Sequence, residues 1–211
     1  MKITKYLILF VLIVAPIKSY ALIEVDITRG NLNPLPIAVS PLSSDQQSKI
    51  DLEKELEIKD IGSEISGVVE NNLRQTGLFN PLDKGAFLQK PDIAHYKPRF
   101  EDWALIKSQA LITGKVSFQD EKLRVEFRLW DVLAGKEMLA LAFTTVPKNW
   151  RRVGHIITDK VYERLTGEKG YFDTRIIYVS EEGPKTQRVK KLAIMDQDGF
   201  NTKYLTLGNE L

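Results

Sequence analysis

The sequence of 211 residues contains no cysteine and only two histidines, and neither sign of charge dominates it. Without cysteine there is no disulfide, no thiolate metal ligand and no thiol for lipid attachment. Lysine and arginine number 30 and aspartate and glutamate 28, and removing the three lysines of the first 21 residues leaves a small acidic excess. Because a nucleic-acid binder usually carries a basic excess on one face, we expect no nucleic-acid partner.

Recognisable catalytic motifs are also missing. There is no Gly-x-Ser-x-Gly or His-Glu-x-x-His, and Gly114-Lys115 is followed by Val116 instead of the hydroxyl residue of a phosphate loop. His95 lies in a proline-rich loop. His155 lies on a predicted helix four residues before Asp159, which suggests an exposed pair on the helix surface. We therefore expect no enzyme, no cofactor and no metal ligand.

A short acidic turn offers one alternative to this expectation. Asp196-x-Asp198-Gly199-x-Asn201 places oxygen ligands at alternating positions around a glycine, as calcium loops do. A calcium loop needs a further acidic residue two positions earlier, where Ile194 stands. The pattern favours a plain hairpin with Asp-Gly at its centre.

The first 21 residues have the layout of a secretory signal peptide. Lys2 and Lys5 precede an apolar run over residues 6–15, and Ser19 and Ala21 place small residues before a cut between Ala21 and Leu22. The alternative is a membrane anchor, but the run is about half of the ~20 residues that a spanning helix needs. We expect export, cleavage and no membrane insertion afterwards.

Residues 22–35 are predicted to be a partner-binding segment. Apolar and polar side chains alternate along it, as in a half-buried strand, until Gly30 and Pro34 interrupt the pattern. Such a segment is suited to adding as a strand to the open sheet edge of another protein. The alternative is an edge strand of its own domain, and a segment that switches between the two positions satisfies both. The candidate binding residues are Leu22, Ile23, Glu24, Val25, Asp26, Ile27, Thr28 and Arg29.

Residues 36–168 are predicted to form an α/β domain, a two-helix sandwich on a mixed or antiparallel sheet. Apolar periodicity predicts helices over residues 60–76 and 149–165, capped by Asp60 and Asn149. Strands are expected over residues 36–42, 110–118, 123–132 and 138–146, the last three as an antiparallel meander. The polar stretch 43–59 is interpreted as a surface insertion holding at most a weak helix.

Residues 169–211 have a different character. Strands are predicted over residues 174–180, 188–195 and 203–206. Three short strands bury little by themselves, which suggests the beginning of a second, all-β domain.

The segment from Leu165 to Val179, LTGEKGYFDTRIIYV, resembles the hinge signature of the TolB family. Residues 60–62 with 72–82, residues 103–116 and residues 193–201 resemble that family in order and spacing. The resemblance implies an amino-terminal α/β domain followed by a six-bladed β-propeller, of which residues 169–211 would be the hinge and an incomplete first blade.

The same resemblance implies a function. TolB proteins are non-catalytic periplasmic adaptors of the Gram-negative Tol–Pal system, which supports outer-membrane integrity and invagination during cell division. In that family the propeller binds Pal, and the extreme amino terminus of the mature protein binds the inner-membrane protein TolA. By position, the TolA-binding segment here is Leu22–Arg29. Because nearly all of the propeller is missing from this sequence, Pal binding is not assigned to these residues.

Two other functions stay open at this point. One is a periplasmic activator of peptidoglycan synthesis on a similar α/β domain, which the missing lipid-accepting cysteine disfavours. The other is the front part of a propeller-containing hydrolase. The sequence does not decide whether residues 171–211 are ordered or whether residues 22–30 rest docked or released.

Overall fold

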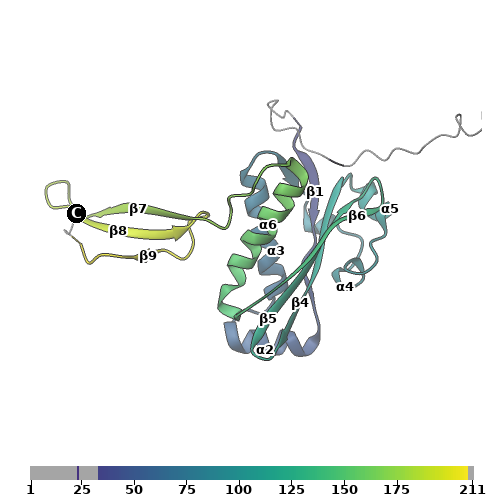
Figure 1. The fold of residues 1–211 in the computed structure, drawn as a ribbon, viewed down its shortest axis with the longest axis horizontal. Coiled ribbons are helices and arrows are strands. Elements are labelled where there is room, and N and C mark those ends of the chain that lie inside the picture. Colours follow the sequence, from purple (N-terminus) through teal and green to yellow (C-terminus); the bar gives the residue numbers. More distant parts are fainter. Residues whose placement is uncertain (1–22, 24–32, 209–211) are drawn as a thin grey trace, which may run out of the picture.

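A computed structural model of the chain describes residue 23 and residues 33–208. A six-stranded mixed sheet carries helices on both faces, and a separate three-stranded sheet follows it, as Figure 1 shows. The predicted α/β class is therefore correct for the described residues. The predicted signal peptide and residues 22 and 24–32 of the predicted partner-binding segment lie outside them.

The larger sheet has the strand order β3-β1-β4-β5-β6. Strand β1 is parallel to both of its neighbours, β3 and β4. Strands β4, β5 and β6 form the predicted antiparallel meander, in which Ile112 faces Leu129. A two-residue strand also pairs with β4. The two shortest strands, β2 and β3, carry too few residues to show a period and were not predicted. The bounds are β1 (Leu35–Val39), β2 (Ser43–Ser44), β3 (Phe79–Pro81), β4 (Ala110–Gln119), β5 (Lys122–Asp131) and β6 (Lys136–Thr145).

The two predicted amphipathic helices pack against each other over one face of this sheet. Helix α3 (Ile61–Gln75) begins at Asp60, whose carboxylate accepts a hydrogen bond from Ser63 N. Helix α6 (Trp150–Thr166) ends at Gly167, which adopts the left-handed conformation expected of a C-cap glycine. Asn149 stands at the expected N-cap position of α6, but its side chain makes no capping hydrogen bond, because its amide donates to Thr145 Oγ1.

The expected surface insertion at residues 43–59 is in fact part of the domain core. It contains β2 and helix α2 (Gln46–Leu56), in which Leu52 is 1% exposed. Ser48 explains the attachment, because its buried hydroxyl accepts a hydrogen bond from Phe118 N on β4. The sequence pattern misled because only Ser48 and Leu52 of this otherwise charged helix are fully buried, which is too few to show an apolar stripe.

Short elements cover the opposite face of the sheet. They surround Trp103, which is 1% exposed and donates its indole N–H to Gln89. A second, smaller apolar cluster forms there around this tryptophan, Leu111 and Val132. The elements are η1 (Lys84–Ala86), α4 (Pro91–Ala94) and α5 (Phe100–Leu105); η2 (Pro147–Asn149) leads into α6.

The three strands predicted after residue 170 pair in sequence order as an antiparallel sheet: β7 (Arg175–Glu182), β8 (Val189–Asp196) and β9 (Lys203–Tyr204). Figure 1 shows this sheet projecting away from the α/β domain, with the end of β8 near α6. Ile177 and Val179 expose about half of their surfaces or more. Among the described residues, no helix combines the length and the apolar character that crossing a membrane requires.

Candidate functional site: the N-terminal groove and the domain junction

Of the candidate binding residues 22–29, the structure describes Ile23 alone, and residues 33–35 at the end of the predicted partner-binding segment lead into β1. The side chain of Ile23 is half-buried and packs against the main core cluster. The other candidate binding residues, Leu22 and residues 24–29, lie outside the described part. The position of this segment beyond Ile23 therefore stays a prediction.

Ile23 lines a groove of about 640 Å³ between β6 and α6. Strand β6 is the last strand of the sheet, so its outer edge has no strand partner among the described residues. Leu141 on this strand is 37% exposed. A groove lined by apolar side chains of β6 and charged side chains of α6 can hold one or two apolar side chains of an extended segment. The groove is lined by Ile23, Leu139, Leu141, Lys160, Glu163, Arg164 and Gly167.

A second site forms where the turn after β8 meets α3 and α6. Arg151 on α6 forms an ion pair with Asp198, and its guanidinium lies 3.8 Å from the centre of the Phe200 ring. Gln197 Nε2 donates to Asn72 Oδ1 on α3 at 2.9 Å. The turn at residues 196–200 is thus bound to both helices by polar contacts.

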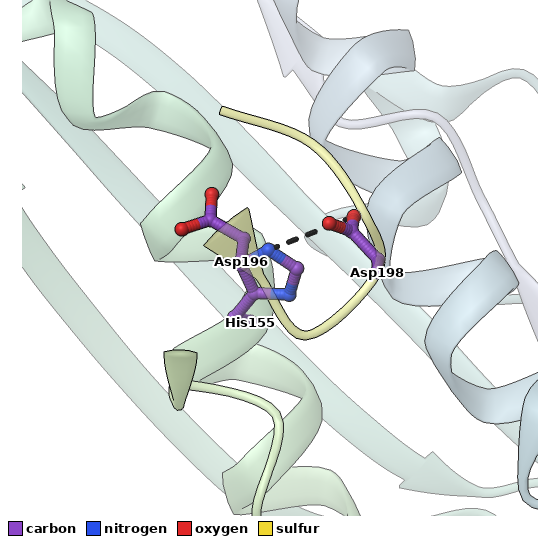
Figure 2. Close-up of side chains that lie close together, drawn as sticks. All are labelled: His155, Asp196 and Asp198. Atoms are coloured by element: carbon purple, nitrogen blue, oxygen red, sulfur yellow. Dashed lines mark ion pairs between the residues drawn. The ribbon is translucent and has the colours of Figure 1, made fainter. Parts of the chain in front are cut away.

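His155 occupies the centre of this junction, and its expected exposed pairing with Asp159 is wrong. The imidazole is 2% exposed, and its Nε2 lies 3.7 Å from Asp198 Oδ2 (Figure 2). Sequence periodicity missed this because it treats α6 as a helix with one buried face, whereas α3 and the turn cover α6 from two sides. The one feature of the sequence that could have indicated this burial is Gly154, the residue before His155, because a glycine permits close packing of two helices.

Burial is the main cause of a pKa shift at His155: it lowers the pKa of the imidazole below its usual 6.5. The negative charges of Asp198 and Asp196 oppose that shift, and Arg151 adds to it. The neutral imidazole is therefore the favoured form in the docked junction.

Asp159 instead fixes the linker between the two sheets. Its two carboxylate oxygens accept hydrogen bonds from Phe172 N at 2.7 Å and Asp173 N at 3.1 Å. Asp173 in turn forms a bidentate pair with Arg152 of α6. Phe172 is fully buried against the α/β core. The linker is therefore tied to α6 along its length.

His155, Asp196 and Asp198 lie close enough together to suggest a metal site, because one ligand atom from each lies within 4.8 Å of the others. Their existing bonds argue against it. His155 Nδ1 accepts a hydrogen bond from Asn72, so Nε2 carries the proton and offers no lone pair. Arg151 engages the Asp198 oxygen, and the Asp196 carboxylate accepts a hydrogen bond from Asn201. The cluster fits a hydrogen-bonded junction better than a cation site.

Comparison with known proteins gives these features a family. The family described as "TolB amino-terminal domain" matches residues 23–138, more than half of the chain. The chain belongs to the TolB family. The Tol-Pal system protein TolB of Pelagibacter ubique is 82% identical over 204 residues, covering 96% of this chain and 46% of that protein. The chain thus spans about half the length of this TolB relative.

A solved TolB structure shares the fold. TolB from Acinetobacter baumannii superposes with a TM-score of 0.65 at 22% sequence identity, covering 82% of this chain and 39% of that one. The likeness confirms the TolB-like α/β architecture. The assignment of β7, β8 and β9 to a propeller blade stays a prediction.

Proposed function

We propose that this chain is a non-catalytic, periplasmic component of the Tol–Pal system, and that its segment Leu22–Arg29 binds the periplasmic domain of TolA. In this proposal the three-stranded sheet is the first blade of a propeller whose other blades carry the Pal contact. The protein would thereby link inner-membrane TolA to outer-membrane Pal and support membrane integrity and invagination at division.

The observation that supports the proposal most directly is the 82% identity to a TolB protein over nearly the whole chain. Such identity favours the Tol–Pal role over the two alternatives, an activator of peptidoglycan synthesis and the front of a hydrolase. The junction cluster also favours a structural role over catalysis, because its carboxylates are engaged by Arg151 and Asn201.

The geometry of Ile23 supports a segment with two positions. Its side chain packs against the core cluster and lines one side of the groove that Leu141 also lines. A contact of one isoleucine with an open groove is worth about 1.5–3 kcal/mol at most, a cost that a partner's sheet edge can repay through main-chain hydrogen bonds. We infer that docking in the groove and binding to TolA compete for the same face of the segment.

Two triple variants of the mature chain from Leu22 test this mode of binding. The first replaces the apolar face, Ile23→Ser, Val25→Ser and Ile27→Ser; the second replaces the polar face, Glu24→Ser, Asp26→Ser and Thr28→Ser. Strand addition predicts that the first weakens binding to the soluble TolA domain at least about tenfold, about 1.4 kcal/mol, in titration calorimetry. The second should bind within a few-fold of the parent. Equal losses from both triple variants would contradict an alternating strand.

A further inference from the structure

Asn72 joins the two halves of the junction. It lies fully buried on α3 and uses both ends of its side-chain amide. Its Nδ2 donates to His155 Nδ1 at 2.9 Å and to Thr158 Oγ1 at 3.2 Å. Its Oδ1 accepts from Gln197 Nε2 at 2.9 Å. One side chain therefore contacts both the buried histidine of α6 and the turn after β8.

The surrounding bonds fix the orientation of this amide and the tautomer of His155. The Thr158 hydroxyl donates to Gly154 O at 2.8 Å, so its oxygen is left to accept from Asn72. The Asn72 amino group then faces His155 Nδ1, which must accept. The single proton of the neutral imidazole is on Nε2 and points toward Asp198.

A second proton on His155 is incompatible with this arrangement. It must add at Nδ1, where the amino group of Asn72 already donates. The amide of Asn72 would have to turn its oxygen toward the imidazolium. Gln197 Nε2 then loses the acceptor that binds the turn to α3.

We propose that Asn72 couples the protonation of His155 to the docking of the 196–200 turn, so that acid loosens this turn from α3 and α6. The coupling acts between the α/β domain and the following sheet and does not depend on TolA binding.

The charges around His155 define the direction of the effect. Asp196 and Asp198 face it from the turn, Asp173 from the linker and Arg151 from its own helix. Burial outweighs the three carboxylates, so the pKa of His155 in the docked junction lies below 6.5. The proposal requires that undocking, which exposes the ring to water, returns its pKa toward 6.5 by more than the loss of Asp196 and Asp198 lowers it, so that the undocked imidazole binds the proton more tightly. Docking is therefore fully stable above about pH 6.5 and is weakened as the pH falls below that value.

The absence of native cysteine allows a direct measurement of docking. Gln75→Cys at the end of α3 and Thr202→Cys before β9, both at exposed positions, take spin labels on the full chain. Pulsed electron paramagnetic resonance then reports the distance between α3 and the turn at pH 8 and pH 5. We expect one narrow distribution at pH 8 and a broader one with a longer component at pH 5.

His155→Gln removes the titrating group, and the other buried histidine provides the matched control. His95 is also 2% exposed with a pKa lowered by burial, but it follows α4, away from the turn. In the His95→Gln variant the distance distribution should broaden at pH 5 as in the parent, whereas in the His155→Gln variant it should stay narrow. A parent distribution that is the same at both pH values, or broadening that persists in His155→Gln, would overturn the proposal.

Nitrogen-15 NMR of the imidazole gives a second test on the unsubstituted chain, independent of whether the variant folds. At pH 8 we expect the His155 tautomer protonated at Nε2, and a titration midpoint below 6.5. A proton on Nδ1 at pH 8 would remove the basis of the coupling and refute it.

Discussion

At the scale of single residues, Gly154 determines how closely α3 and α6 approach. A Cβ at this position would lie 2.9 Å from Val68 Cγ1 and 3.4 Å from Ile65 O. Neither neighbour is the free end of a flexible side chain, so the helices would have to separate. This spacing also places His155 within reach of Asn72, which makes the glycine a requirement of the junction.

Gly154→Ala should therefore destabilise the protein by about 1–3 kcal/mol, because overpacking outweighs the gain in helix propensity. Gly67→Ala on α3 is the matched control. No atom outside its own helix turn lies within 4 Å of a Cβ there, so this change should stabilise by up to about 1 kcal/mol. Urea denaturation of both variants measures the difference. A Gly154→Ala protein as stable as Gly67→Ala would contradict the close packing.

Asp159 gives a second prediction at this scale. Asp159→Ala removes the acceptor of two backbone amides, those of Phe172 and Asp173, and leaves both without their partner. We expect a loss of about 1.5–3 kcal/mol in the free energy of unfolding. Asp159→Asn keeps one acceptor oxygen and should lose less. Equal stability of the alanine variant and the parent would show that the burial of Phe172 and the Arg152–Asp173 pair hold the linker without Asp159.

At the scale of secondary structure elements, the helices with a wide apolar stripe and the alternating strands could be predicted from the sequence. Leu123, Val125, Phe127 and Leu129 are all buried, as the strict alternation on β5 indicates. The packing of helix α2 onto the domain could not be predicted, since its attachment depends on the Ser48 hydroxyl accepting a hydrogen bond from a backbone amide of β4, a contact over 70 residues of sequence. The burial of His155 depends in the same way on a turn that is distant in the sequence.

The cap of α2 tests whether this helix is integral to the domain. Asp45 accepts hydrogen bonds from both the backbone amide and the hydroxyl of Ser48. The hydrogen bond from the amide is the main cause that lowers the pKa of the Asp45 carboxyl below 3.8. Asp45→Ala should cost about 1 kcal/mol by chemical denaturation at pH 7. The difference from the parent should shrink as the pH falls below the ordinary pKa of aspartate, because the carboxylate that forms the cap becomes protonated. A cost that is constant down to pH 2 would argue against a charged cap.

At the scale of the whole molecule, the family and the α/β architecture could be predicted from the sequence, because the segment Leu165–Val179 and three further blocks carry the TolB pattern. The junction could not, since it assembles Asn72, His155 and Gln197 from three distant segments. Helix α6 connects the groove at β6 to the second sheet. It lines the groove at β6, holds the linker through Asp159 and binds the turn after β8 through Arg151.

Calorimetric titration of the TolA periplasmic domain with the mature chain from Leu22, beside a shortened chain from Asn31, tests the central claim most directly. The account predicts binding by the longer chain and none by the shorter one, because the alternating side chains of residues 22–29 supply the contact. Equal binding by both chains would place the TolA site on the folded domain, and absence of binding by both would contradict the TolA-binding role proposed here.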